Sequence, residues 1–271
     1  LSHKDPLHWT GAQQNWNYMC AECHSTNLHK NYDAQLKRFN TTWSEINVSC
    51  EACHGPGADH LAWAKKEGDW QKLNPTKGLA ITLDERRSLH FHLRTLAMKG
   101  LSLATTALNR PPSILWTTTP TTGSAPRSTP RNPSRELDVC ARCHSRRGQF
   151  WEDYVFGQPL LDTHRLALLT PDLYYPDGQM KDEVFNHGSF LQSKMFAKRV
   201  SCGDCHEPHS GKLRATGSKV CLQCHLVAKY ESPQHHFHPI DAKGVDCVAC
   251  HAPTTTYMVV DPRHDHSFRI P

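Results

Sequence analysis

Apolar residues along this chain fall in short groups at helical spacing, separated by polar segments that contain glycine or proline. A capping pattern at Thr42–Glu45 predicts that a short helix begins there, runs through Ile46 and ends at Gly55. Apolar residues at helical spacing predict two further helices, over 58–70 and 181–198. The pattern therefore predicts a mainly α fold with much irregular coil and little β structure.

The segment 102–134 differs from the rest of the chain in composition. Threonine, serine, proline and arginine predominate in it. Prolines at this density exclude a regular helix or a central strand. Two interpretations stay open. The segment is either an extended linker between two modules or a disordered insertion without a function of its own. We assign residues 88–134 to this linker or insertion.

The pattern Cys-x-x-Cys-His occurs six times and uses all 12 cysteines of the chain. On a helical turn, positions i, i+3 and i+4 share one face, so the two thiols and the imidazole can reach a single group. This pattern is the signature of covalent haem attachment, in which the thiols form thioethers and the histidine binds the iron. The predicted covalent residues are Cys20, Cys23, Cys50, Cys53, Cys140, Cys143, Cys202, Cys205, Cys221, Cys224, Cys247 and Cys250. The predicted proximal ligands are His24, His54, His144, His206, His225 and His251.

A single copy of this motif could also be a redox dithiol or half of a zinc site. A zinc or disulfide framework would explain the cysteine pairs but not a histidine after every pair. With 20 histidines in 271 residues, chance does not place one after all six pairs. The sequence therefore predicts six covalently attached haem c groups.

The composition agrees with a fold built around such cofactors. Apolar residues make up only 38% of the chain and the mean hydropathy is −0.61, which is poor for a protein core of this size. We expect haem to supply the missing apolar volume, so the chain should not fold stably without it. Haem propionates would shift the formal charge of +5 by about −6 in the oxidised protein, so the charge is no indication of nucleic-acid binding.

Six irons also need distal ligands. Histidine on both faces closes the iron to substrates and gives a low-spin haem of low potential, suited to electron transfer. The five methionines are competing ligands, but each is better explained as core filling. The candidate distal histidines, in order of preference, are His209, His60, His236, His238, His235, His266, His264, His164, His29 and His8.

The spacing of the motifs suggests two haem-bearing modules. Residues 1–87 form a predicted dihaem module, and residues 135–271 form a tetrahaem module. In the second module only 14 residues separate His206 from Cys221, which forces the bound haems close together. Thioether attachment occurs outside the cytoplasm, so we expect the periplasm, the cell surface or the extracellular space. The chain contains no apolar stretch of 18 residues, so the sequence predicts no transmembrane helix. It does not begin with an initiator methionine, so we expect a mature, processed or partial chain.

Two stretches carry a resemblance to a known family. The fourth and fifth motifs, 202–209 and 221–225, resemble the doubled Cys-x-x-Cys-His module of multihaem cytochromes c. Residues 43–57 and 256–268 resemble the haem-bearing part of bacterial multihaem cytochromes that continue into tetratricopeptide repeats. The resemblance covers most of 5–87 and 127–271 and implies a helical, irregular scaffold wrapped around closely stacked bis-histidine haems. More distantly, the chain is similar to cytochromes that shuttle electrons for nitrite reduction and hydroxylamine oxidation.

These observations favour an electron-transfer protein that relays single electrons to and from redox proteins or other cytochromes. A narrower form of this hypothesis is a filament subunit, a homo-oligomer assembled by haem stacking between adjacent chains. The rival hypothesis is a nitrite, hydroxylamine or sulfur-oxyanion oxidoreductase with one open haem, for which the sequence indicates no catalytic residue. A third is a haem-stabilised module that binds a partner complex through 102–134.

Overall fold

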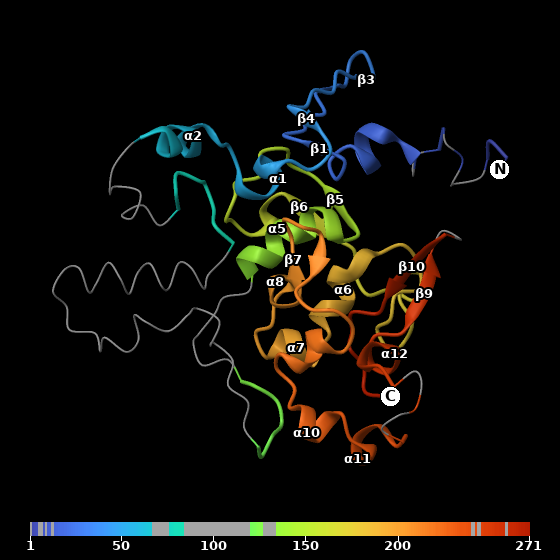
Figure 1. The fold of residues 1–271 in the computed structure, drawn as a ribbon. Helices are drawn as coiled ribbons and strands as arrows, with labels where there is room; N and C mark the ends of the chain where they lie inside the picture. Colours follow the sequence, from blue (N-terminus) through green and yellow to red (C-terminus); the bar gives the residue numbers. More distant parts are fainter. Residues whose placement is uncertain are drawn as a thin grey trace. The chain divides into compact units, whose positions relative to one another are not determined.

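The computed structural model describes residues 2–4, 8, 10–11, 14–66, 76–83, 120–126, 134–239, 242, 245–257 and 260–271 (Figure 1). They group into two compact units. The first unit draws on Leu1–Leu83, Asp138–Cys143 and Arg147–Arg165, and the second on Asp84–Leu137, His144–Arg146 and Leu166–Pro271. The predicted division into a dihaem module, a linker and a tetrahaem module concerns bound haems and stays a prediction. Most of the predicted linker lies outside the described residues.

The first unit consists of short helices and two-residue strands. The π-helix η2 (Trp16–Cys20) precedes β1 (Ser25–Thr26), β2 (Tyr32–Asp33), β3 (Arg38–Phe39) and β4 (Glu45–Ile46). β1 pairs with β4 and β2 pairs with β3, both antiparallel. The helices α1 (Cys50–His54) and α2 (Ala58–Lys65) follow. The 3-10 helix η4 (Leu160–Asp162) lies between β5 (Arg147–Gln149) and β6 (His164–Leu166), which pair with each other.

The predicted helix start at Thr42–Glu45 is wrong. The backbone of Thr42 instead exchanges two hydrogen bonds of 2.9 Å with that of His29, and the N–H of Ser44 donates to the carbonyl of Thr26. Antiparallel pairing with residues 25–29 thus satisfies the backbone groups that a helix would have used. The helix begins only at Cys50, after an extended Ser49.

The other predicted helices are present in shorter form. Within the described residues, the helix expected over 58–70 is α2, which ends at Lys65, and positions 67–70 lie outside them. The helix expected over 181–198 is divided into α6 (Phe185–Leu191) and α7 (Lys194–Ala197). The break occurs at Ser193, whose hydroxyl accepts a hydrogen bond from the N–H of Phe196 and so begins a new helix.

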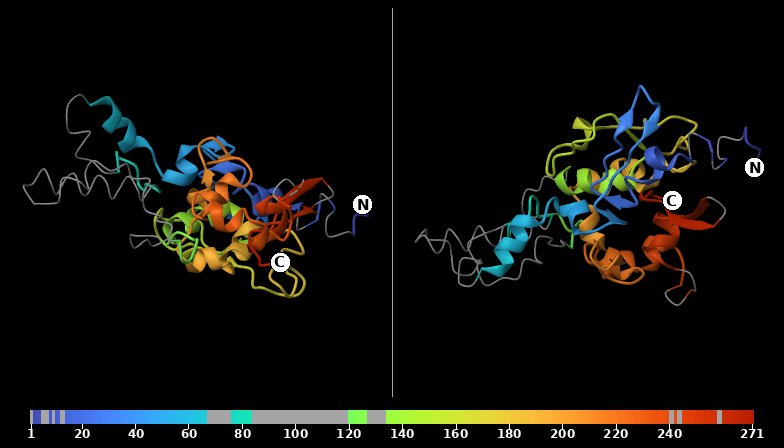
Figure 2. Two further views of the ribbon diagram at one scale, coloured as in Figure 1. Left: turned by 60° about the horizontal axis from the view of Figure 1, so that its bottom comes forward. Right: turned by 90° about the horizontal axis from the view of Figure 1, so that it is seen from above.

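In the second unit, the remaining elements are helical turns and short hairpins. They are α8 (Cys202–Cys205), β7 (His206–Glu207), β8 (Lys212–Leu213), α9 (Lys219–Leu222), α10 (Val227–Tyr230), α11 (Pro233–His236), α12 (Cys247–His251), β9 (Thr254–Tyr257) and β10 (Asp261–His264). α5 (Ser134–His144) contributes residues to both units. The β9–β10 hairpin, red in Figures 1 and 2, directly follows α12.

The apolar core is small. In the second unit it consists of Tyr174, Met180, Val184 and Tyr257, with Leu173 packed against it. The hydroxyl of Tyr257 donates a 2.7 Å hydrogen bond to the carbonyl of Met180. Short helices, much coil and paired strands of two to four residues confirm the predicted fold class among the described residues. None of the described helices has the length and apolar character needed to cross a bilayer.

Candidate haem-binding sites

In each of the six motifs the two cysteines lie on a helical turn, which brings their thiols to one face. In the fourth motif His206 follows α8 in an extended conformation and begins β7, and its N–H donates to the carbonyl of Cys202. The second and sixth motifs form α1 and α12, and the third ends α5 at His144. In the first motif, the N–H of His24 donates to the carbonyl of Cys20 at 3.1 Å, and in the fifth motif His225 donates to Cys221 at 3.0 Å. All 12 cysteines lie among the described residues, and none of them forms a disulfide. The turns therefore present the donor set that haem c requires.

Two of the predicted proximal histidines are fixed through their Nδ1 atoms. Nδ1 of His54 lies 2.9 Å from the carbonyl oxygen of Ile81, and Nδ1 of His251 lies 2.7 Å from that of Arg269. A carbonyl oxygen only accepts, so Nδ1–H is the donor in both contacts. This tautomer leaves the Nε2 lone pair available to an iron, which is the second-sphere arrangement typical of histidine ligands.

Two of the predicted distal histidines face a proximal one. The ring centroids of His206 and His266 are 6.3 Å apart with planes at 15°, and those of His251 and His235 are 5.9 Å apart, also at 15°. A metal about 2 Å from each Nε2, between two imidazoles, separates their centroids by about 6 Å. The spacing and orientation of both pairs therefore fit two imidazoles that would hold one haem iron between them.

Burial keeps the first pair in the metal-binding form. Desolvation lowers the pKa of His206, and also that of His266, so both imidazoles are neutral near neutral pH. Nδ1 of His266 donates to the carbonyl of His264 at 2.9 Å, which again leaves Nε2 available.

Two other distal candidates present Nε2 in the same way. Nδ1 of His60 donates to the carbonyl of Lys77 at 2.7 Å, and its ring stacks on that of Trp63. Nδ1 of His264 donates to the carbonyl of Ala252, also at 2.7 Å. Both residues stay predicted distal ligands.

Five further candidates lie near the surface or in pairing segments. Nδ1 of His209 lies 3.1 Å from Glu207, on a side chain that is 79% exposed, and Nδ1 of His8 lies 2.8 Å from the hydroxyl of Thr10. The rings of His236 and His238 are 6.1 Å apart, and Nδ1 of His236 accepts from the N–H of His238. His29 pairs through its backbone with Thr42.

His164 has a different environment. Its side chain is fully buried, its Nδ1 lies 2.7 Å from the hydroxyl of Thr163, and its Nε2 lies 2.7 Å from Oε1 of Glu22. Both ring nitrogens are therefore engaged within the protein. For this reason His164 is not among the distal ligands that we propose below.

Glu22, inside the first motif, belongs to a buried ionic cluster that the sequence did not indicate. Its Oε2 lies 3.1 Å from Nη2 of Arg147, and the two side chains are 5% and 6% exposed. Burial alone would raise the pKa of Glu22, but the hydrogen bond from His164 and the charge of Arg147 lower it overall. The carboxylate is thus ionised and holds the first attachment turn in place.

In the second unit, the fifth and sixth attachment turns meet. The thiols of Cys221 and Cys247 hydrogen-bond to each other, which lowers the pKa of Cys247 to about 6 and raises that of Cys221. The hydroxyl of Ser218, which precedes α9, donates to Asp246 at 2.7 Å and accepts from the N–H of Cys247 at 3.1 Å. Groups attached to these two turns must therefore be neighbours.

Residues 120–126 pack on the fifth motif, although they belong to the predicted linker. The N–H of Ala125 donates to the carbonyl of Cys224 at 2.8 Å, and that of Leu226 donates to the carbonyl of Gly123 at 2.7 Å. Gly123 has φ +69°, and a Cβ there would lie 2.3 Å from Cδ of Lys229, so a larger residue would be strained and would displace the lysine side chain. Ser124 reaches the ring of His225, with Oγ 3.1 Å from Nδ1.

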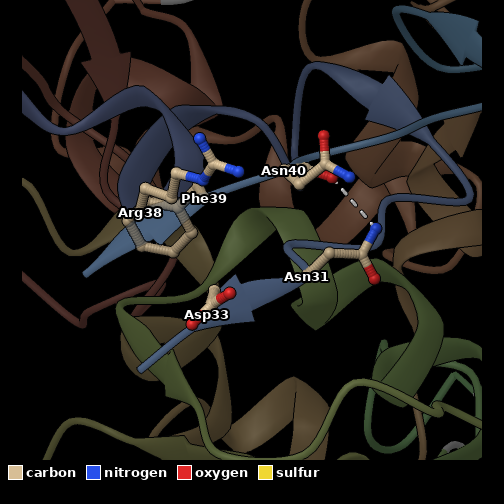
Figure 3. Close-up of a pocket in the computed structure, with 5 residues that line it drawn as sticks. All are labelled: Asn31, Asp33, Arg38, Phe39 and Asn40. Carbon is tan, nitrogen blue, oxygen red and sulfur yellow. Dashed lines mark hydrogen bonds between the residues drawn. The ribbon is translucent and has the colours of Figure 1, made fainter. Parts of the chain in front are cut away.

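A polar pocket occupies the β2–β3 hairpin (Figure 3). Asn31, Asp33, Arg38, Phe39 and Asn40 line it, and Nδ2 of Asn31 donates to the carbonyl of Asn40 at 3.1 Å. Oδ1 of Asp33 accepts from two backbone N–H groups of the turn. No cysteine or histidine of the six motifs lines this pocket, so it does not belong to the haem-binding sites.

Comparisons with known proteins agree with these sites. The family described as "Doubled CXXCH motif" matches residues 194–229, which contain the fourth and fifth motifs. The family "Cytochrome c554 and c-prime" matches residues 4–55, which contain the first and second. The chain carries the motifs and the fold of a multihaem c-type cytochrome. No curated protein matches the sequence.

One solved structure is similar in fold to most of the chain. It is the crystal structure of the outer cell wall cytochrome OcwA, which superposes with a TM-score of 0.53 at 16% sequence identity. The match covers 94% of this chain and 56% of that chain, so the present chain spans little more than half of its length. At this identity the likeness concerns the fold.

Proposed function

We propose that this chain is a hexahaem c-type cytochrome that relays single electrons outside the cytoplasm. When bound, haem supplies the chemistry, because its iron gains or loses one electron at a time. The polypeptide holds each haem through the two thiols and the proximal histidine of one motif. The observation that carries this proposal is the pairing of His206 with His266 at 6.3 Å and 15°.

Paired histidines favour electron transfer over catalysis. A ligand on each face leaves an iron no open position for a substrate. We propose His206 with His266 and His251 with His235 as axial pairs, and we retain the other distal candidates, except His164, for the remaining haems. An oxidoreductase acting on nitrite, hydroxylamine or a sulfur oxyanion would need one open iron, and this alternative stays a prediction.

Contacts between attachment turns support a relay. The fifth and sixth turns meet through Cys221 and Cys247, and thioether formation at these sulfurs would place the edges of two haems side by side. Electrons would then pass between neighbouring haems. Redox proteins or other cytochromes are the proposed partners, and assembly into a filament by haem stacking stays a prediction.

The proposed location is the periplasm, the cell surface or the extracellular space. Thioether attachment of haem outside the cytoplasm supports it, as does the similarity in fold to OcwA, an outer cell wall cytochrome.

Electron paramagnetic resonance of the oxidised protein, combined with carbon monoxide binding to the reduced protein, tests this function. We expect six low-spin haems and no carbon monoxide adduct. A stoichiometric high-spin signal together with carbon monoxide binding would instead establish an open site and favour the oxidoreductase.

A further inference from the structure

The thiol of the first attachment turn points toward the third turn. Sγ of Cys23 lies 3.8 Å from the carbonyl oxygen of Arg142 and 3.9 Å from that of Cys143. The thiols of Cys23 and Cys143 also hydrogen-bond to each other. Cys23 and Cys143 are 120 residues apart in the sequence, so the first motif meets the third through its haem-bonding atoms.

The third turn also contacts the second. Nη1 of Arg142, between the two cysteines of the third motif, donates a 3.0 Å hydrogen bond to the carbonyl of Ala52. Ala52 lies between the two cysteines of the second motif. The guanidinium of Arg142 lies 4.7 Å from the ring centroid of Tyr154 and 5.2 Å from that of Phe156, which holds it in place.

The side chains of Arg147 and Arg142 add polar groups at the third turn. Nε of Arg147 donates to the carbonyl of Arg142 at 2.6 Å, and its Nη2 donates to Sγ of Cys23 at 3.5 Å. Nε of Arg142 is buried and has no acceptor among the described residues, as expected for a donor that faces a bound group.

The first and second turns meet each other differently. The N–H of Asn47 donates to the carbonyl of His24 at 2.8 Å, and β1 pairs with β4. These contacts join His24 of the first motif and the strand after it to the segment that precedes the second motif, whereas Cys23 and Ala52 both face residues of the third motif itself.

We propose that the third attachment turn is the junction of the first unit, so that electrons pass between the first and second haems through the third. This inference rests on the proposed function. Arg142 is its positioning residue, because it joins the third turn to the second and places a positive charge beside Cys53 and Cys143. Each transfer oxidises one iron and reduces its neighbour by one electron, so no further reactant is required.

The iron positions in the full holoprotein, determined by crystallography or electron cryo-microscopy, decide the order. We expect the third iron to be the nearest neighbour of both the first and the second. The inference is overturned if the first and second irons are each other's nearest neighbours. Six closed haems in that other order would leave the proposed function intact, whereas missing thioethers or an open iron would overturn the function instead.

Redox titration of three variants tests the role of Arg142 separately. A positive charge favours the reduced haem, so Arg142→Gln should lower the potentials of the second and third haems. We expect about a tenfold change in each one-electron equilibrium, or about 59 mV. Arg142→Lys, which keeps the charge, should shift them less, and Arg165→Gln, at an exposed position of the same unit, should shift none. Equal haem potentials in Arg142→Gln and in the native protein would overturn the role of Arg142. If the variant binds less haem, the iron positions in the native protein still decide the order of the haems.

Discussion

The hydroxyl of Ser124 lies 3.1 Å from Nδ1 of His225, the predicted proximal ligand of the fifth haem. The same oxygen lies 3.0 Å from the hydroxyl of Tyr230, and the backbones of Ser124 and His225 form an isolated β-bridge. For His225 to bind iron through Nε2, its Nδ1 must carry the proton and donate it to Ser124. A residue of the predicted linker therefore orients a ligand of the fifth site.

Replacing this hydroxyl should change the fifth haem alone. In Ser124→Ala, Nδ1–H of His225 loses its acceptor, so the imidazole becomes a weaker donor and the haem potential should rise. A net hydrogen-bond contribution of about 1 kcal/mol corresponds to roughly 40 mV for one electron. Redox titration followed by visible spectroscopy measures the shift.

Ser124→Thr is the matched control, because it keeps the hydroxyl and should restore the native potential. An unchanged titration curve in Ser124→Ala would show that Ser124 does not act on the ligand. Equal shifts in the alanine and threonine variants would show that only packing is affected.

The two proposed axial pairs predict spectroscopic changes. His266→Ala and His235→Ala should each convert one low-spin haem into a high-spin haem, because each removes one distal nitrogen. Electron paramagnetic resonance measures the number of high-spin centres, and added imidazole should reverse each conversion. If either variant kept the native number of low-spin haems, that pair would be wrongly assigned.

The buried Glu22–Arg147 pair predicts a non-additive loss of stability. Glu22→Gln leaves Arg147 buried without a counter-charge, and Arg147→Met leaves Glu22 without one, so each should cost about 3–5 kcal/mol. The double variant should lose less than the sum of the two, because it leaves no unpaired charge. Denaturant unfolding of the holoproteins measures these differences, with Arg165→Gln as the exposed control. Strictly additive losses would contradict the coupling.

Tyr257 predicts a pH dependence of stability. Burial raises its pKa to about 12, against about 10 in an unfolded chain. A raised pKa means that the folded state favours the neutral phenol. The contribution of Tyr257 to the free energy of unfolding is therefore complete below pH 10 and is lost as the pH rises toward 12. Tyr257→Phe should be about 1 kcal/mol less stable at pH 7, because the hydrogen bond to Met180 is lost.

Unfolding measurements of both proteins between pH 7 and pH 12 test this sign. The stability of Tyr257→Phe should fall less steeply above pH 10, so the two curves should approach each other. Parallel curves would contradict the assignment of the ionisation to Tyr257.

Local features of this molecule were predictable from the sequence, whereas long-range contacts were not. The attachment turns follow from the Cys-x-x-Cys-His spacing, and α2, α6 and α7 lie within the ranges that the apolar spacing predicted to be helical. The helix start at Thr42 was wrong because pairing with His29 competes for the same backbone groups. Periodicity carries no information about such pairing.

The contacts that complete the sites link distant parts of the chain. Ser124 and His225 are 101 residues apart, and Arg142 and Ala52 are 90 apart. The candidate His164 was chosen because it lies in a mixed apolar run, and the buried carboxylate of Glu22, 142 residues away, occupies its Nε2 instead. The position of Arg142 between two motif cysteines does not indicate which carbonyl oxygen its side chain will bind.

Intact-mass spectrometry of the denatured native protein tests the central claim most directly. Thioether bonds survive denaturation, so the account predicts the polypeptide mass of 30.7 kDa increased by six haems, with no free thiol left to alkylate. A bare polypeptide mass with 12 alkylatable thiols, or zinc in place of iron in the native material, would contradict it.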